Sequence, residues 1–300
     1  MSLIGNSGQK VGDGSTAIQA GGDVSLGNTT TEIVTICELV VSSKMSSLKE
    51  EAMMIAMERA HEFGTKVALN LSNKLDEKIE SKLRDPDIQY AISQAVMQVA
   101  TKGISEKNDL LQELIISKIN NEDEDSDLLI DLALETAKRT TSSELKLLGL
   151  IFYFRKCTKA FHGVDITTLV QSDDDTVSID GITKDTCWKI FNSVYTNPNI
   201  DFDRITSGTD SIKRVDIDIM SLKGLTLSDK HFRTSYFDLL EKRTGTKLSN
   251  SQIEFEKSFP ELSYILNCFG INTLEEFNSI ALSALGDVIA KDYLKARKFL

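Results

Sequence analysis

The chain has 300 residues, of which 41% are hydrophobic, and a formal net charge of -11. This length and apolar content suffice for two packed domains and exclude a chain that is disordered throughout. The acidic excess opposes a general attraction to nucleic-acid phosphates or anionic lipid, and the longest apolar run, residues 145–154, is too short to cross a membrane. Residues 1–12 lack the basic start and apolar middle of a secretory signal, so we expect a soluble, cytoplasmic protein.

The amino-terminal segment is rich in glycine, with seven of the seventeen glycines among the first 27 residues. The glycines alternate with isolated apolar residues, a spacing typical of short strands joined by tight turns. Because so few apolar side chains cannot form a core alone, the pattern predicts a β-module over residues 1–28 that stacks on copies of itself. A flexible leader is the alternative. The packing residues of this module would be Ile18, Gly21, Gly22 and Val24.

Residues 29–84 change to a helical period. The pairs Thr29 with Glu32 and Ser47 with Glu50 have the spacing of capping boxes and predict the starts of two helices. The second helix carries apolar residues at alternating spacings of four and three, as in a coiled coil. We expect this seam to contribute to oligomerisation, with burial in the chain's own core as the alternative. The seam residues are Met53, Met57, Ala60, Val67 and Leu71.

Residues 85–160 predict a domain built as an antiparallel helical array. Asp85-Pro86 marks a helix start and Gly103 its end. Further helices are expected over residues 110–119 and 128–137, separated by an acidic loop over residues 120–127. Thr141 and Glu144 form another capping box before the most hydrophobic helix of the chain, residues 145–154, which we expect in the core.

Residues 161–300 have a mixed pattern that predicts a winged-helix-like α+β domain. A helix over residues 215–222 ends before Gly224, a second is expected over residues 228–242, and a strand over residues 277–282. A last helix begins after Ser283. The expected fold class is therefore mainly α, with a short glycine-rich β-module at the amino terminus and this α+β unit at the carboxyl end.

Candidate catalytic groups are sparse in the sequence. Cys157, His162 and Asp165 are close enough to suggest a thiol nucleophile with its base, but no family signature surrounds Cys157, and a buried thiol with a surface histidine is the favoured explanation. The four cysteines are far apart, and the aspartate loop over residues 173–175 lacks the glycine and glutamate of a calcium loop. We therefore expect no metal and no cofactor.

Basic residues of the carboxyl-terminal domain raise a second hypothesis, nucleic-acid binding by its winged-helix-like unit. Acidic neighbours oppose this reading, because phosphate contacts need a locally positive surface. The residues that would make the contacts are Lys184, Lys189, Lys213 and Arg214.

Two sets of motifs resemble those of an uncharacterised bacterial family of about this length, associated with phage-defence regions. The first is Gly8-Gln9 followed by residues 19–24, QAGGDV; the second comprises residues 84–87, RDPD, and Leu285-Gly286 with Ile289-Ala290. The carboxyl-terminal part is weakly similar to abortive-infection proteins of the alpha type. The resemblance implies a bacterial conflict role and supplies no catalytic residues.

These observations favour a non-enzymatic oligomeric sensor or adaptor that meets a protein partner without binding a membrane. Nucleic-acid binding is the first alternative, and an enzyme of unrecognised type using the group around Cys157 is the second.

Overall fold

The computed structural model of the chain describes residues 28–72, 77–103, 106–156, 178–179, 182–183, 202–227, 235–244 and 246–300. The expected β-module over residues 1–28, apart from its last residue, lies outside this part of the chain. The group Cys157, His162 and Asp165 also lies outside it, as do Lys184 and Lys189.

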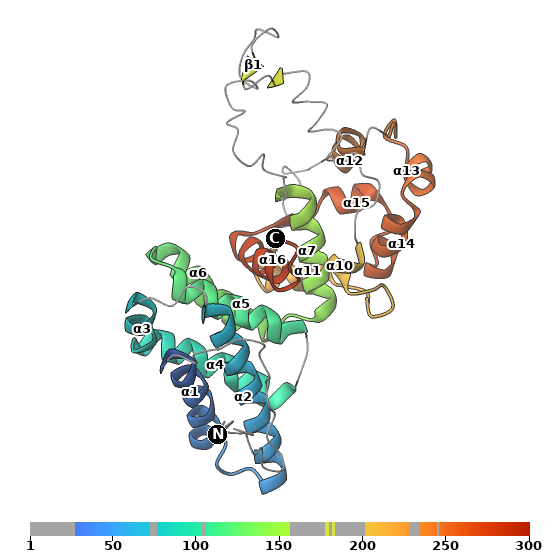
Figure 1. Cartoon of the computed structure of the whole chain (residues 1–300). Coiled ribbons are helices and arrows are strands. Elements are labelled where there is room, and N and C mark those ends of the chain that lie inside the picture. The colour runs from blue at the N-terminus through green and yellow to red at the C-terminus, as the bar shows by residue number, and fades with distance from the viewer. Residues whose placement is uncertain are drawn as a thin grey trace, which may run out of the picture.

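Helices dominate the described structure, which confirms the expected mainly α fold class (Figure 1). The first group of helices accounts for nearly all described residues up to position 156. Their bounds are α1 Asn28–Lys44, α2 Glu50–Ser72, α3 Glu77–Leu83, α4 Pro86–Lys102, α5 Glu106–Asn120, α6 Glu124–Ala137 and α7 Ser142–Lys156.

Among the described residues from 178 onward, the second group combines shorter helices with four two-residue strands. Two antiparallel pairs form, β1 with β2 and β3 with β4. The strands are β1 Ser178–Ile179, β2 Ile182–Thr183, β3 Thr226–Leu227 and β4 Ala281–Leu282. The helices are α10 Phe202–Thr206, α11 Ile217–Leu222, α12 Tyr236–Thr244, α13 Gln252–Ser258, α14 Pro260–Phe269, α15 Leu274–Asn278 and α16 Ala284–Ala296.

Several helix ends follow from local chemistry that the sequence displays. The Asp85 carboxylate accepts from the Asp87 N–H ahead of Pro86, and the Gly103 N–H donates to the Val99 carbonyl, so the predicted start and end of α4 are confirmed. The Thr141 N–H donates to Glu144 at 2.6 Å, and the Glu144 N–H donates to the Thr141 hydroxyl at 3.2 Å. This reciprocal pair is the predicted capping box of α7.

Some predicted boundaries were wrong. The loop expected over residues 120–127 is shorter, because the Asp123 side chain accepts from the Ser126 N–H and α6 begins at Glu124. The strand expected over residues 277–282 is reduced to β4, because the Thr273 hydroxyl caps the short helix α15 just before it. In both places a side-chain cap starts a helix inside a stretch whose composition is typical of a loop or a strand.

The seam on α2 lies within the chain's own packing. Ala60, Val67 and Leu71 are buried, while Met53 and Met57 are partly buried against the same core. A Cβ added at Gly64 would lie 3.0 Å from the Cys37 Sγ of α1, so this glycine permits a close approach of α1 and α2. These residues therefore pack against other helices of the same chain, which is the alternative to oligomerisation that the sequence left open.

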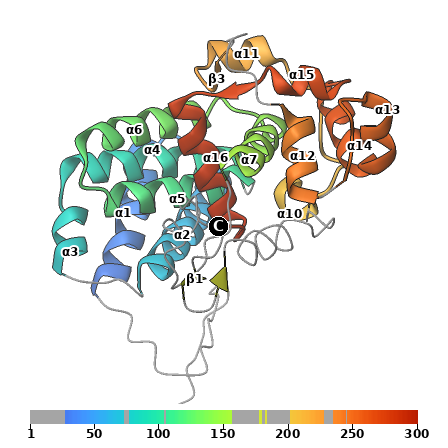
Figure 2. The same cartoon turned by 90° about the horizontal axis from the view of Figure 1, so that it is seen from above.

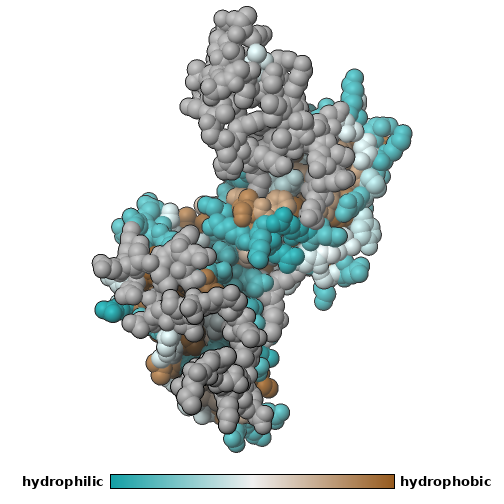
Figure 3. Space-filling model, in the orientation of Figure 1, coloured by the Kyte–Doolittle hydropathy of each residue, from teal (hydrophilic) through white to brown (hydrophobic). Residues whose placement is uncertain are grey.

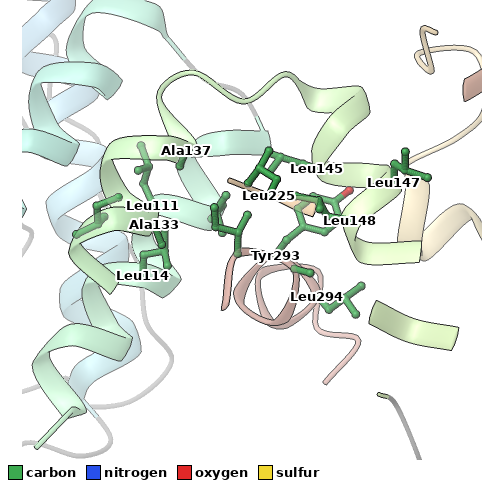
Figure 4. Close-up of a cluster of buried hydrophobic side chains, with 14 of the residues drawn as sticks. Leu111, Leu114, Ala133, Ala137, Leu145, Leu147, Leu148, Leu225, Tyr293 and Leu294 are labelled. Atoms are coloured by element: carbon green, nitrogen blue, oxygen red, sulfur yellow. The ribbon is translucent and has the colours of Figure 1, made fainter. Parts of the chain in front are cut away.

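The centre of the fold is α16, which contacts α5, α6 and α7. Figures 1 and 2 show α16, in red, between the α1–α6 group and the helices α10–α15. Figure 4 shows the buried side chains that meet there from α5, α6, α7 and α16, including Leu111, Ala133, Leu148 and Tyr293. Tyr293 is fully buried, and its hydroxyl donates to the Ile205 carbonyl at 2.9 Å. As expected, α7 is a core element: its apolar residues from Leu145 to Ile151, and Phe154, are fully buried.

The start of α16 is joined to β3 by a close backbone contact. The Ser283 hydroxyl accepts from the Gly286 N–H at 2.9 Å and donates to the Gly224 carbonyl. A Cβ added at Gly286 would lie 2.0 Å from the Leu225 carbonyl oxygen. Any side chain at this position would therefore force the β3 region away from α16.

We predict that Gly286→Ala destabilises the fold. In an open helix, this change would stabilise by about 1 kcal/mol through helix propensity, but the backbone clash should instead destabilise by about 3 kcal/mol. Urea denaturation measures the difference, with Lys291→Ala, an exposed position of α16, as the control. If Gly286→Ala were as stable as the control, the backbone of Leu225 could not lie as close to Gly286 as the structure has it.

Candidate functional site

The best-defined polar site among the described residues is centred on Lys118, in the last turn of α5. Its side chain is fully buried, and its Nζ lies 2.7 Å from Asp87, 2.8 Å from Asp127 and 2.7 Å from Asp131. Asp87 belongs to α4 and the other two aspartates to α6, so one ammonium group joins three helices. We call these four residues the Lys118 cluster.

The electrostatics of the cluster favour a permanent ammonium. Burial by itself lowers the pKa of Lys118, but the hydrogen bonds that its ammonium group donates to Asp127, Asp131 and Asp87 outweigh burial and hold this pKa above its usual range. A lysine that stays protonated has no free electron pair, so it serves neither as a base nor as a nucleophile. Its role is to bind the three carboxylates.

The three carboxylates have the spacing of metal ligands, since one oxygen from each lies within 4.8 Å of the others. However, the Lys118 Nζ is within 2.8 Å of an oxygen of every one of them. The ammonium group therefore already supplies the positive charge that a cation would bring. The cluster is explained as an ion-pair junction.

Local sequence positions each member of the cluster. Asp87 follows the Asp85 cap and Pro86, so it projects from the first turn of α4. Lys118 lies at the carboxyl end of α5, where a cation complements the helix dipole. Asp127 and Asp131 are four residues apart and share one face of α6.

Beside the cluster lies a groove between α4 and α6. The Lys118 cluster joins Asp87 to Asp131, and seven residues further along each helix the Lys138 Nζ donates to the Gln94 side-chain oxygen. The two helices therefore run in the same direction and are tied at two points about 10.5 Å apart along their axes. The groove has a volume of about 520 Å³.

The groove has an apolar floor and a mixed rim. Ala91 and Leu134 are buried at its base. Tyr90, Leu128 and Leu132 line it while remaining 66%, 62% and 48% exposed. The charged side chains at the rim are Asp87, Asp131, Glu135 and Lys138. Such a surface is suited to binding a partly apolar ligand.

Other buried ionic groups likewise connect helices. Glu144 is 4% exposed and accepts from the Lys223 Nζ at 2.7 and 2.8 Å, which joins α7 to the end of α11.

The Cys37 thiol is not a nucleophile near neutral pH, because burial and, to a lesser extent, the nearby Glu38 raise its pKa to about 12. His61 contacts Glu38 at 2.8 Å in an exposed pair.

Of the residues predicted for nucleic-acid contact, Lys213 and Arg214 are exposed in the segment before α11. The Lys213 N–H donates to the Ser143 hydroxyl, and Arg214 packs over Gly270. Sequence reasoning missed the Lys118 cluster. The available signal was the pair Asp127 and Asp131 on one helix face, but nothing in the sequence indicates that Lys118 lies opposite them.

The model of one protein family, described as ":-like", matches residues 27–198. The chain belongs to this family. The matched region begins one residue before α1 and includes all of α1 to α7, so the Lys118 cluster and the groove lie within it. No curated protein and no solved structure matches the chain. Every helix that the structure describes is too short or too polar to span a lipid bilayer.

We predict that Lys118→Met lowers the free energy of unfolding by about 2 kcal/mol near neutral pH. The cost stays below that of breaking a fully buried pair because the aspartate side chains are 33–54% exposed. The loss comes from repulsion among the three carboxylates, which the ammonium group of Lys118 no longer offsets.

The control is Lys66→Met, which removes an exposed i, i+4 pair with Glu62 and should cost less than about 0.5 kcal/mol. Urea denaturation near neutral pH measures both variants. Equal stabilities of the two variants would contradict the ion-pair junction.

Proposed function

We propose that the protein is a non-enzymatic oligomeric sensor or adaptor, in which the module over residues 1–28 assembles copies and the helical body meets a protein partner. The observation that carries this proposal is the Lys118 cluster beside its groove. Lys118, one of two fully buried lysines among the described residues, joins three helices, and the adjoining surface offers exposed apolar side chains. This arrangement suits binding better than proton transfer.

Assembly rests on the amino-terminal module rather than on the seam of α2. Ala60, Val67 and Leu71 are already covered by the chain's own helices, so they offer little free surface to a second copy. The module residues proposed for packing between copies are Ile18, Gly21, Gly22 and Val24. Joining several copies would raise the effective concentration of each groove and so strengthen weak contacts.

The setting proposed for this adaptor is the bacterial cytoplasm, in defence against phage. The support is the resemblance of the motifs around residues 19–24, 84–87 and 285–290 to proteins of phage-defence regions. Two of those motifs have clear roles here, since Asp87 belongs to the Lys118 cluster and Gly286 admits the backbone of Leu225.

A second candidate function is nucleic-acid binding by a winged-helix-like carboxyl-terminal unit. In its favour, α11 is followed by β3, β3 pairs with β4, and Lys213 and Arg214 are exposed just before α11. The chain's net charge of -11 opposes it, so this candidate ranks below the adaptor.

For the adaptor, we predict that deleting residues 1–28 lowers the mass measured by light scattering to that of a single chain. In the full-length chain, replacing Ile18 and Val24 by serine should lower the mass as well, because it removes apolar packing from the module. Leu222→Ser, a highly exposed position on α11, is the control and should leave the mass unchanged. A deletion that leaves the mass unchanged would remove the module from the proposal.

For nucleic acid, the test is binding to a labelled duplex at increasing salt. Contacts to several phosphates predict a steep fall of affinity with salt, and Lys213→Ala with Arg214→Ala should reduce the slope by about one phosphate contact each. Binding that is absent, or insensitive to salt, would exclude this second candidate.

A further inference from the structure

We propose that the groove between α4 and α6 is a docking site for a basic amphipathic helix of a partner protein. The inference rests on the proposed adaptor function and specifies the chemistry of its partner. It follows from the apolar side chains of the groove, the charges around it and the two ties that fix its walls.

Both helices contribute apolar side chains to the site. Tyr90 on α4 and Leu128 and Leu132 on α6 are large side chains with apolar surface, and each is about half exposed or more. They adjoin the buried floor formed by Ala91 and Leu134. Ala91 has a small side chain, so the groove has room for apolar side chains of a partner, which Tyr90 and the two leucines would contact. On the one face that Figure 3 shows, the described surface is mainly hydrophilic, and hydrophobic atoms reach it in smaller areas.

The charge around the groove is negative. Asp87, Asp131 and Glu135 lie at its rim, and Asp123, Glu124 and Asp125 are exposed at the start of α6. Three cations near these carboxylates already have partners: Lys118 binds the cluster, Lys138 binds Gln94 and Arg139 pairs with Glu135. Since carboxylates outnumber these three cations, a positively charged partner is favoured.

The shape suits a helix. The two ties lie about two helical turns apart, and apolar residues at positions i, i+4 and i+7 of a partner helix span about the same 10.5 Å. Because the Lys118 cluster and the Lys138–Gln94 hydrogen bond join α4 and α6 at both ends, the walls need not rearrange on binding. A preformed groove loses less conformational entropy when it is filled.

A second copy of this chain is a poorer occupant. Pairing this face with itself would bring the acidic start of α6 and the rim carboxylates of two copies together, in a chain whose net charge is already -11. The resulting repulsion would have to be overcome by burial of a few apolar side chains.

The probe for the test is a fluorescein-labelled peptide of about fifteen residues built from leucine and lysine, with leucine at i, i+4 and i+7 spacing. Fluorescence anisotropy with the full chain should show binding that Leu128→Ser with Leu132→Ser weakens about tenfold or more. The control, Ile219→Ser with Leu222→Ser on α11, also removes two exposed apolar side chains and should bind as wild type does. A peptide with glutamate in place of lysine should bind far more weakly.

A second pair of double variants tests whether the acidic residues at the start of α6 contribute to binding of the basic peptide. Glu124→Gln with Asp125→Asn should weaken binding several-fold, whereas Glu254→Gln with Glu261→Gln, in the first turns of α13 and α14, should not. The proposal is overturned if the lysine peptide binds no better than the glutamate peptide, or if the groove variants bind like their controls.

Light scattering distinguishes a second copy of this chain from a partner helix as the occupant of the groove. If the chain without residues 1–28 still dimerises, and Leu128→Ser with Leu132→Ser abolishes the dimer, a second copy fills the groove and the partner helix is excluded. Since this readout uses the deleted chain, failure of the groove proposal is distinguishable from failure of assembly by the amino-terminal module.

Discussion

A single buried ammonium group fixes the arrangement of three helices in this protein. Lys118 is the point at which α4, α5 and α6 are joined by charge, and its three aspartate partners come from two different helices. Removing a charge of this kind from water costs free energy, which close carboxylates offset. The resulting geometry sets the spacing of α4 and α6 and thereby shapes the groove between them.

The same chemistry explains why this polar site suits recognition better than catalysis. A catalytic group needs a pKa near the working pH, whereas the aspartates hold the pKa of Lys118 above its ordinary range. Glu144 is similarly bound by Lys223 and by the N–H of Thr141. Among the described residues, these buried charges stabilise contacts between helices, and three exposed apolar residues, Tyr90, Leu128 and Leu132, line the groove beside the Lys118 cluster.

Local signals predicted much of the fold because helix ends depend on a few neighbouring residues. Asp85-Pro86, Gly103 and the Thr141–Glu144 box mark ends that the structure confirms. The expected loop over residues 120–127 was too long because the cap at Asp123 is a single side chain in an acidic run. The Lys118 cluster was not predictable, since its members are separated by up to 44 positions and meet only through packing. The period of α2 likewise identified a buried stripe without showing which helix covers it.

Hydrogen–deuterium exchange of the wild type and Lys118→Met tests most directly whether this ammonium group holds the groove together. We expect faster exchange in Lys118→Met over residues 86–94 and 124–138, where α4 and α6 lose their shared partner, and unchanged exchange in α14, which does not contact the cluster. Exchange that is unchanged in α4 and α6, or that rises equally in α14, would contradict a local electrostatic tie.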